Sequence, residues 1–286
     1  MRDFIISVES VCDIDQQTLK ENDIRVVPMK FMVNDVEFRS DDKSFEVEKI
    51  CKFMREGATT KTTQINEFEA KEFLEGLLKE GKDVLHLSFS STHSGTCQNF
   101  INAANELNKT HSNKVYVVDT LCQAGGIGVL LKFLLKNIEK NNLDVIKSKD
   151  FVEENKLKIC HIFTVENLKY LIKGGRISKT NAFLGTLLQI KPICYLNSKG
   201  VMLPFKKVVG RKKSVLELYE SFKSKFNNSC SDVIIAHADC ENDAKTLADL
   251  IKKNFNINAI IVPLNLVVTA HGGPGTLSLY FVGNNR

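Results

Sequence analysis

Residues 84–118 read VLHLSFSSTHSGTCQNFINAANELNKTHSNKVYVV, and this stretch decides the fold class. Residues 84–89 and 115–118 are short apolar, β-branched runs typical of buried strands, whereas residues 94–107 between them carry a helical pattern, with Ser94 or Gly95 at its start. A strand, a helix and a second strand in this order form a crossover that returns the chain in the same direction. The stretch therefore predicts a parallel sheet covered by helices.

The same alternation runs through the first half of the chain, while the second half mixes hairpin-like strand pairs with helices. We therefore expect an α/β protein of two domains: a parallel-sheet α/β/α domain over residues 1–160 and a mixed-sheet α+β domain over residues 161–286. The other expected strands are residues 4–8, 24–38 with a turn at Asn34-Asp35, 158–163, 192–196, 202–209, 233–237, 257–263 and 277–282, and the other expected helices are residues 16–21, 45–55, 68–79, 128–139, 165–172, 179–188, 215–226 and 241–254.

Composition limits the class of protein. The chain has 286 residues, of which 43% are hydrophobic and 26% charged, which is typical of a globular protein and excludes a disordered one. The net charge of +5 is small and its charges are scattered, so we expect no nucleic-acid partner. No apolar run of about 18 residues occurs, so we expect no transmembrane segment. The opening MRDFIISVESVCD does not read as a signal peptide.

The eight cysteines indicate a reducing compartment. None of them forms a CxxC pair and the six histidines do not cluster with them, so their spacing predicts no zinc site. An even number of cysteines implies disulfides only in a secretory context, which this sequence does not suggest. We therefore expect free thiols in a cytoplasmic protein that holds no metal.

Two loops are rich in hydroxyl groups. Residues 59–64, TTKTTQ, lie between two expected helices, and residues 88–96, SFSSTHSGT, follow a strand and open a helix. Such loops lie at the carboxyl ends of parallel strands, where open α/β sheets bind ligands. Hydroxyls together with free N–H groups at a helix start suit an anion such as a carboxylate. Each loop taken singly is explained as well by helix capping and turn formation.

Two glycine-rich turns carry a charged or titratable side chain. Arg176 projects from the turn at residues 173–178, KGGRIS, and its guanidinium suits bidentate contact with a phosphate or carboxylate. A helix C-cap followed by a solvated cation explains that turn equally well. His271 opens the turn at residues 271–275, HGGPG, where a stiff backbone would hold the imidazole for hydrogen bonding or for acid–base work. The alternative there is an ordinary turn with an exposed ring.

Two further patterns are discounted as known motifs, a third motif is absent, and a fourth pattern has a structural explanation. The glycines of residues 125–128, GGIG, lack the third glycine of a dinucleotide turn, because Leu131 stands there. The turn at residues 271–275 is similar to an esterase oxyanion loop, but no GxSxG elbow follows it. No GxxxxGK[ST] P-loop occurs, so the chain carries no ATP site of that type. Residues 237–239, HAD, end a strand, and Asp239 is expected to cap the next helix.

The order of the remaining motifs resembles that of the DegV family, two-domain bacterial proteins that bind a long-chain fatty acid. The family's SSxxSGT, KGGRIS, HAD and HxGPG motifs are intact, while its TSQP loop has Thr63 in place of Ser and Ile65 in place of Pro. The family's opening acidic-Ser-x-x-Asp element has Glu9 where Asp is usual. The positions are residues 90–96, 173–178, 237–239, 271–275, 62–65 and 9–13, with a VxDS-like element at residues 117–120.

This resemblance implies a lipid tunnel between the two domains. It implies that Thr62 or Thr63, Ser94 and His271 bind the fatty-acid carboxylate. It further implies that the chain presents the lipid to a separate DAK-type fatty acid kinase subunit, which forms the acyl phosphate. By the same resemblance, Arg176 would meet the kinase or the phosphate, with Arg211 as a second candidate. Phe100, Phe183 and Leu187 are candidates for shaping the tunnel.

Two functional hypotheses follow. The first is a carrier without catalysis or cofactor of its own, whose partners are the fatty acid, the kinase and, transiently, a membrane. The second is a stand-alone acyl hydrolase or acyltransferase that uses Ser94 as nucleophile and His271 as base, which requires a hydrogen bond between them and a third orienting group.

Overall fold

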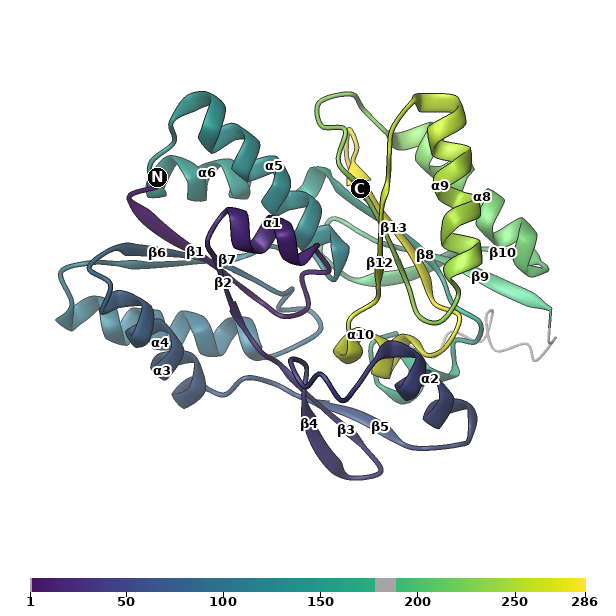
Figure 1. Cartoon of the computed structure of the whole chain (residues 1–286), viewed down its shortest axis with the longest axis horizontal. Helices are drawn as coiled ribbons and strands as arrows, with labels where there is room; N and C mark the ends of the chain where they lie inside the picture. Colours follow the sequence, from purple (N-terminus) through teal and green to yellow (C-terminus); the bar gives the residue numbers. More distant parts are fainter. Residues whose placement is uncertain (1, 178–188) are drawn as a thin grey trace.

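Three β-sheets and their covering helices make up the chain. The computed structural model describes residues 2–177 and 189–286, so the helix expected at residues 179–188, with Phe183 and Leu187, lies outside the described residues. In Figure 1 a first sheet and its helices occupy one half of the molecule, a second sheet and its helices occupy the other, and a small hairpin sheet extends below. This arrangement confirms the expected α/β class.

The first sheet is parallel throughout and has the strand order β2-β1-β6-β7. Its central strand β1 is buried along its whole length, as the apolar run predicts. Helices α3 and α4 lie on one face and α6 on the other, with α5 packed beside α6 (Figure 1). The bounds are β1 Phe4–Glu9, β2 Ile24–Val27, β6 Asp83–Ser88, β7 Val115–Asp119, α1 Gln16–Glu21, α3 Glu67–Leu78, α4 Thr96–Thr110, α5 Gly125–Asn141 and α6 Val145–Asn155.

The small sheet is antiparallel and has the order β4-β3-β5. Strands β3 (Lys30–Val33) and β4 (Val36–Arg39) turn at Asn34-Asp35, where both residues have positive φ, which confirms the expected turn. Strand β5, Thr60–Thr63, was expected to be a loop, and that expectation is wrong. Threonine is β-branched and favours strands, and β5 pairs with β3 in register from Thr60 to Thr63. Helix α2, Val47–Arg55, connects β4 to β5.

The second sheet is mixed and has the order β10-β9-β8-β13-β11-β12. All its neighbours are antiparallel except β11 and β12, which run parallel, and this confirms the expected mixed sheet. The hairpin expected between β9 and β10 is present, with Gly200 at positive φ in its turn. The bounds are β8 Ile159–Thr164, β9 Ile190–Leu196, β10 Met202–Val209, β11 Val233–His237, β12 Ile260–Pro263, β13 Leu277–Val282, α7 Lys169–Lys173, α8 Arg211–Lys225, α9 Glu241–Phe255 and α10 Leu266–Gly272, with a 3₁₀ turn at Lys156–Lys158.

Helix α5 joins the two halves. It contacts β8, β11 and β13 of the second sheet, while α8 and α9 cover the opposite face (Figure 1). The glycines at its start allow close packing against both halves, because a Cβ on Gly126 would overlap the His161 imidazole of β8 and one on Gly128 would lie 2.7 Å from the Cys12 carbonyl oxygen after β1. The GGIG pattern therefore serves helix packing, consistent with its rejection as a dinucleotide turn.

Two local expectations in the second half are wrong. His271 lies in the last turn of α10, not in a turn outside any helix, because Asn265 caps this helix by accepting a hydrogen bond from the Val268 N–H. Asp239 does not cap α9, whose N-cap residue is Cys240. Asp239 has a positive φ and pairs instead with Arg55 on α2.

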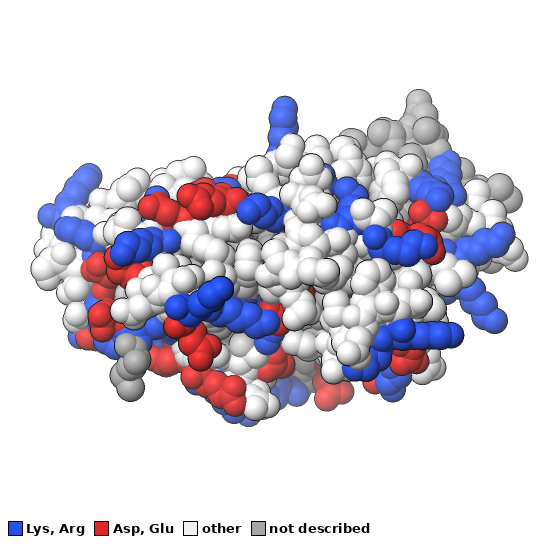
Figure 2. All heavy atoms as spheres, turned by 90° about the horizontal axis from the view of Figure 1, so that it is seen from above, with Lys and Arg blue, Asp and Glu red and all other residues white. Residues whose placement is uncertain are grey.

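The domain boundary expected near residue 160 would fall at the start of β8, Ile159. The division into residues 1–160 and 161–286 stays a prediction, since α5 packs on the second sheet and α10 packs on α2 and β5. Charges of both signs are interspersed over the face seen in Figure 2, as the small net charge suggests. Among the described residues, no helix combines the length and apolar character that crossing a bilayer requires.

Candidate functional site

A cavity of about 590 Å³ lies between elements of the two halves. Its wall is mainly apolar, with hydroxyl, imidazole, amide and guanidinium groups from five separate segments. Such a cavity with a few convergent polar groups is typical of a small-molecule site. The residues that line it are Val11, Met29, Thr62, Thr63, Gln64, Phe89, Ser91, His93, Ser94, Gly95, Gln123, Leu171, Arg176, Met202, Val267, Val268 and His271.

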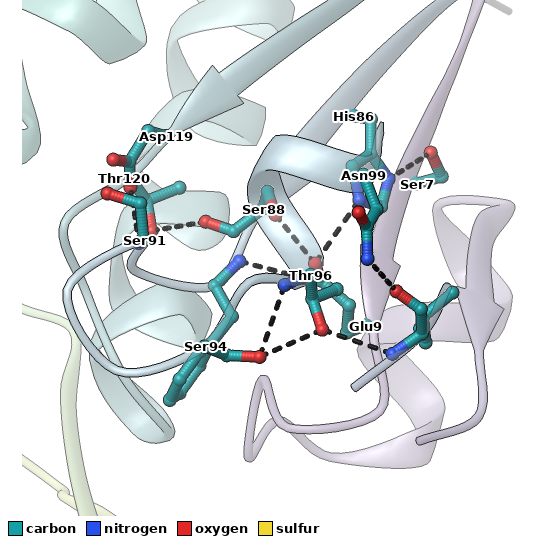
Figure 3. Close-up of polar contacts among 12 residues, drawn as sticks. Ser7, Glu9, His86, Ser88, Ser91, Ser94, Thr96, Asn99, Asp119 and Thr120 are labelled. Atoms are coloured by element: carbon teal, nitrogen blue, oxygen red, sulfur yellow. Dashed lines mark hydrogen bonds and ion pairs between the residues drawn. The ribbon is translucent and has the colours of Figure 1, made fainter. Parts of the chain in front are cut away.

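The loop before α4 places Ser94 at this cavity. The Ser94 hydroxyl lies 2.9 Å from the Thr96 hydroxyl and accepts a hydrogen bond from the Thr96 N–H at 3.2 Å (Figure 3). The Thr96 hydroxyl in turn accepts a hydrogen bond from the Ile65 N–H at 3.2 Å, which fixes the loop against the segment after β5. Ser94 is therefore oriented by backbone and hydroxyl groups next to the N-terminus of a 15-residue helix.

Strand β5 and helix α10 bring Thr62 and His271 together across 209 residues of sequence. The Thr62 hydroxyl lies 2.8 Å from Nε2 of His271. The Thr60 hydroxyl also donates to the Ala270 carbonyl at 2.7 Å, so two contacts anchor β5 to α10. The side chain of the neighbouring Thr63 lies on the opposite face of the strand, and its hydroxyl donates to Glu37 at 3.2 Å. Of the two threonines, Thr62 is thus the one whose hydroxyl meets the histidine.

His271 is neutral in this environment. Burial, followed by the nearby Arg176 and His93, lowers the pKa of His271 to about 3. A neutral imidazole keeps one N–H donor and one acceptor nitrogen, and can donate to a carboxylate or to the Thr62 oxygen. Gly174 lies against Nδ1 of this ring, and a side chain at residue 174 would overlap it. Because Gly174 has no side chain, this turn packs directly against the His271 ring.

Arg176 follows that turn and lines the same cavity. Gly175 has φ +70°, which explains the glycine, and the Arg176 guanidinium donates to the Gly174 carbonyl. Burial lowers the pKa of Arg176, but an arginine stays protonated across the physiological range. The site thus combines one permanent cation with neutral donors.

The structure separates Arg211 from the other predicted residues. Arg211 begins α8, and its Nε donates to Asp243 of α9 at 2.8 Å. It is not among the residues that line the cavity. Phe100 likewise is not among the lining residues; it is fully buried and stacks on His86 with ring centroids 3.9 Å apart.

Several lining residues were not singled out from the sequence. Gln64 follows Thr63 directly, and His93 occupies a variable position of the SSxxSGT motif. Nε2 of His93 lies 2.8 Å from the Gly200 carbonyl, so this ring attaches the loop to the β9–β10 turn. Gln123 lies between β7 and α5, and Met202 begins β10; neither segment has a motif that suggests ligand binding. Gln64 belongs to the loop that resembles the TSQP motif, so the sequence could have indicated it. His93, Gln123 and Met202 line the cavity only because tertiary packing brings their segments together.

A second constellation under the loop resembles a catalytic triad but is closed. The Ser7 hydroxyl lies 2.9 Å from Nδ1 of His86, whose Nε2 lies 3.4 Å from Glu9 (Figure 3). All three side chains are fully buried, so no substrate reaches them. Glu9 also accepts hydrogen bonds from the Ser88 hydroxyl at 2.7 Å and the Phe89 N–H at 2.9 Å. The cluster therefore ties β1 to β6 and supports the loop above it.

Ser94 and His271 do not form a nucleophile–base pair. Each makes its hydrogen bond with a threonine, Thr96 and Thr62 respectively, and in the described part of the chain no hydrogen bond joins the two. Nor does any carboxylate hydrogen-bond to the His271 ring among the described residues. The arrangement lacks the geometry of a serine hydrolase. Within residues 2–177 and 189–286, no three His, Cys, Asp or Glu side chains gather as metal ligands.

Comparisons with known proteins place this geometry in a family. A family model described as an uncharacterised protein of the DegV family matches residues 3–284. A fatty acid-binding protein of Thermotoga maritima is 32% identical over 282 residues, 95% of each chain. The solved structure of a DegV family protein from Thermus thermophilus, described for fatty acid binding, has a TM-score of 0.87 at 26% identity and covers 99% of this chain and 100% of its own.

A third comparison concerns the fold alone. The fatty acid kinase B3 protein of Streptococcus pneumoniae, solved with linoleic acid, has a TM-score of 0.86 at 22% identity and covers 99% of this chain and 100% of its own. The two sheets and the parallel and mixed topology described above are thus shared with solved DegV structures. Since the family model spans nearly the whole sequence and the Thermotoga relative exceeds 30% identity over 95% of both chains, this chain belongs to the DegV family.

Proposed function

We propose that the protein binds a long-chain fatty acid in the cavity and presents its carboxylate to a separate kinase subunit. The observation that carries the proposal is the convergence of Thr62, Ser94 and His271 on the wall of one largely apolar cavity. Related proteins named for fatty acid binding support it. The chain itself acts as a carrier and takes no cofactor.

Burial of the acyl chain supplies the affinity. An acyl tail of about 14 methylenes, at about 0.8 kcal/mol each, contributes about 11 kcal/mol before the entropy costs of binding. The tail needs no polar contact for this gain. The carboxylate does need hydrogen bonds, because desolvating it without partners would offset much of the gain.

Neutral donors suit a carboxylate that must react. The Thr62 and Ser94 hydroxyls and the N–H of neutral His271 hydrogen-bond the carboxylate without forming an ion pair with it. A buried bidentate arginine would stabilise the negative charge more strongly and make the oxygen a weaker nucleophile. The lowered pKa of His271 keeps that ring neutral, in agreement with this role.

The kinase step transfers a phosphoryl group to the bound lipid. A carboxylate oxygen attacks the γ-phosphorus of ATP held by the DAK-type subunit, the bond from that phosphorus to the bridging oxygen breaks, and ADP leaves. Positioning and charge neutralisation dominate such a transfer. Arg176 lines the cavity beside His271 and supplies a cation for the transferred phosphoryl group or for the kinase. Arg211 is the second candidate for kinase contact; it lies outside the cavity lining, and its guanidinium nitrogens Nη1 and Nη2 are buried.

The compartment follows from the thiols. All eight cysteines are free, and seven of them are buried. We therefore place the protein in the cytoplasm, where thiols stay reduced. Transient contact with a membrane would supply and receive the fatty acid.

A coupled assay tests this function. Delipidated protein is loaded with oleate and mixed with a DAK-type fatty acid kinase subunit and ATP, and acyl phosphate is measured. Formation of acyl phosphate only when lipid, both proteins and ATP are present supports the proposal. Turnover of an acyl ester by the protein alone would instead support the hydrolase, which the separation of Ser94 from His271 disfavours.

A further inference from the structure

The cavity carries more basic groups than a fatty-acid carboxylate requires. Its lining includes Arg176, His93 and His271, and among the described lining residues there is no Asp or Glu. Burial and, to a lesser degree, the charge of Arg176 lower the pKa of both histidines, and His93 adds to the effect on His271. The three side chains therefore lie within electrostatic range of one another. A carboxylate bears one negative charge, so this surplus of nitrogen groups suits a head group with more oxygens and more charge.

His93 is held in the cavity wall with a defined position for its proton. Its Nε2 lies 2.8 Å from the Gly200 carbonyl oxygen in the β9–β10 turn. A carbonyl oxygen only accepts hydrogen bonds, so Nε2 carries the proton and, in the neutral ring, Nδ1 is an acceptor. This contact fixes the tautomer as well as the orientation of the ring.

The other ring nitrogen of His93 is unused. Nδ1 makes no hydrogen bond with any residue that the structure describes. The ring is half-buried, and Nδ1 is not one of the described polar atoms that are sealed from solvent without a partner. His93 therefore offers an acceptor nitrogen without a protein partner at the cavity wall.

His93 is also next to a predicted carboxylate ligand. His93 and Ser94 are consecutive residues of the loop before α4, and this 15-residue helix begins at Thr96. The N-terminus of a helix favours negative charge nearby. An acyl phosphate is larger than the fatty acid by one phosphoryl group, and His93 and Arg176 are the basic side chains of the wall that the predicted carboxylate site does not use.

A phosphoryl group differs from a carboxylate in the proton that it can share. A phosphate monoester loses its second proton near about pH 6, whereas a carboxyl group loses its proton near about pH 4. A P–OH group donates to Nδ1 of a neutral imidazole, and if the proton moves to the ring, Nδ1–H donates to the phosphoryl oxygen. Both arrangements contain the same single proton. A fatty-acid carboxylate at neutral pH has no proton to share, so Nδ1 adds nothing to its binding.

We propose that His93 binds the phosphoryl group of an acyl phosphate by sharing one proton between Nδ1 and a phosphoryl oxygen, while Arg176 balances the remaining charge. This inference rests on the proposed function and adds a residue that distinguishes the phosphorylated lipid from the free fatty acid. His93 occupies a variable position of the SSxxSGT motif, so the motif itself does not supply this role.

A competition experiment tests the role of His93. Delipidated protein is incubated with equimolar myristate and tetradecyl phosphate, a stable analogue of an acyl phosphate, and the bound ratio is read by native mass spectrometry. At about pH 7 we expect the ratio of bound tetradecyl phosphate to bound myristate to be about tenfold higher in the wild type than in His93→Gln, as one hydrogen bond to a charged group provides. Glutamine keeps an Nε2 donor for Gly200 but has no nitrogen in place of Nδ1. His111→Gln, outside the cavity lining, should behave as the wild type.

The pH dependence separates a shared proton from a structural effect. The difference between the wild type and His93→Gln should shrink toward about pH 9, because the phosphoryl group is then fully deprotonated. The charged and titratable groups around His93 do not produce this change. Arg176 stays protonated, and His271, with its pKa lowered to about 3, stays neutral. Lys199, beside Gly200, is exposed to solvent.

Each other outcome has a definite meaning. Equal ratios in the wild type and His93→Gln would overturn the role of His93 while leaving fatty-acid binding intact. An equal loss of affinity for both ligands in His93→Gln would show that the ring only attaches the loop to Gly200, and would also overturn it. Binding of myristate but not of tetradecyl phosphate by the wild type would refute a phosphoryl site. Binding of neither ligand by any of the proteins would instead refute the proposed function.

Discussion

Nε2 of His271 lies 2.8 Å from the hydroxyl of Thr62, and this contact joins helix α10 to the edge strand β5 at the cavity. Thr62 lies in β5 in the first half of the chain, and His271 lies in α10 in the second half. Both are polar groups on a largely apolar wall, and a carboxylate that accepts a hydrogen bond from each would replace the contact between them. The predictions below start from this pair.

Thr62 and Thr63 should differ although they are neighbours. Thr62→Val removes the hydroxyl that meets His271, and we expect fatty-acid affinity to fall about tenfold, as the loss of one hydrogen bond to a charged group predicts. Thr63 also lines the cavity, but its hydroxyl donates to Glu37, so in Thr63→Val the affinity should change less than about twofold. Isothermal titration with oleate measures both. Equal losses would show that the carboxylate does not lie at the Thr62–His271 pair.

Ser94→Ala should lower affinity without unfolding the protein. Its hydroxyl lies at the cavity and is shared with Thr96, so about tenfold weaker binding is expected from the lost contact with the carboxylate. Ser224→Ala, an exposed serine on α8 that bonds only the Ser221 carbonyl, is the matched control. Fatty-acid titration with thermal melting separates binding from stability. Unchanged affinity in Ser94→Ala would remove Ser94 from the site.

The pKa of His271 makes stability depend on pH. The pKa is lowered to about 3 in the folded state and is about 6.5 when unfolded, so the unfolded state binds more protons between these values. The contribution of neutral His271 is present above the unfolded pKa and is lost as pH falls toward the folded pKa. The free energy of unfolding of the lipid-free protein should therefore fall with acidification.

The variant His271→Gln tests whether this pH dependence of the free energy of unfolding comes from His271. Glutamine cannot titrate, so urea unfolding of this variant between about pH 7 and about pH 5 should show a smaller slope than the wild type. Burial also lowers the pKa of His93, His161 and His237, which accounts for the slope that remains. The same slope in both proteins would mean that His271 is exposed to solvent.

Arg176 should separate binding from phosphoryl transfer. Arg176→Ala removes a cation beside the cavity, while the neutral donors stay, so affinity for oleate should remain within about threefold. Acyl-phosphate formation with the kinase subunit should fall about a hundredfold, since charge neutralisation dominates that step. The coupled assay and a lipid titration measure the two effects. Loss of lipid binding with normal kinase coupling would contradict the assignment.

A pair of glycine variants tests how the halves pack. Gly126→Ala places a methyl group where the His161 ring lies, and we expect a loss of about 2 kcal/mol in the free energy of unfolding. Gly76→Ala, in the exposed interior of α3 with no atom within 4 Å of the added Cβ, should gain about 1 kcal/mol. Thermal unfolding compares them. A neutral Gly126→Ala would show that α5 lies farther from the second sheet.

The sequence predicts most strands and helices because the apolar residues that face the core recur with the period of each helix or strand. Strands β1 and β11 are buried throughout, β6 is buried after Asp83, and all three are rich in apolar residues. The small strand β5 has no such run, since its four residues, TKTT, are polar and it forms one edge of a three-stranded sheet. Helix α10 is seven residues long, too short to show a helical period, and only the cap residue Asn265 could have indicated it.

The residues of the candidate site also divide into those with a local sequence pattern and those without one. Ser94, His271 and Arg176 lie in motifs with their own local signature, so the sequence alone indicates them. Which of Thr62 and Thr63 faces the histidine depends on the pleat of β5, which a loop assignment does not contain. Gln123 lines the cavity because the turn before α5 lies against β8, where the Gln123 N–H donates to His161, a contact between residues far apart in sequence. Such tertiary neighbours leave no local pattern.

The most direct test of the central claim is mass spectrometry of the delipidated protein after incubation with a long-chain fatty acid, under native and then denaturing conditions. We predict one fatty acid bound per chain under native conditions and its complete release on denaturation, with binding weakened by Thr62→Val but not by Thr63→Val. No bound fatty acid, or an acyl group that stays attached to Ser94 after denaturation, would contradict a carrier that holds its lipid by non-covalent contacts at the Thr62–His271 pair.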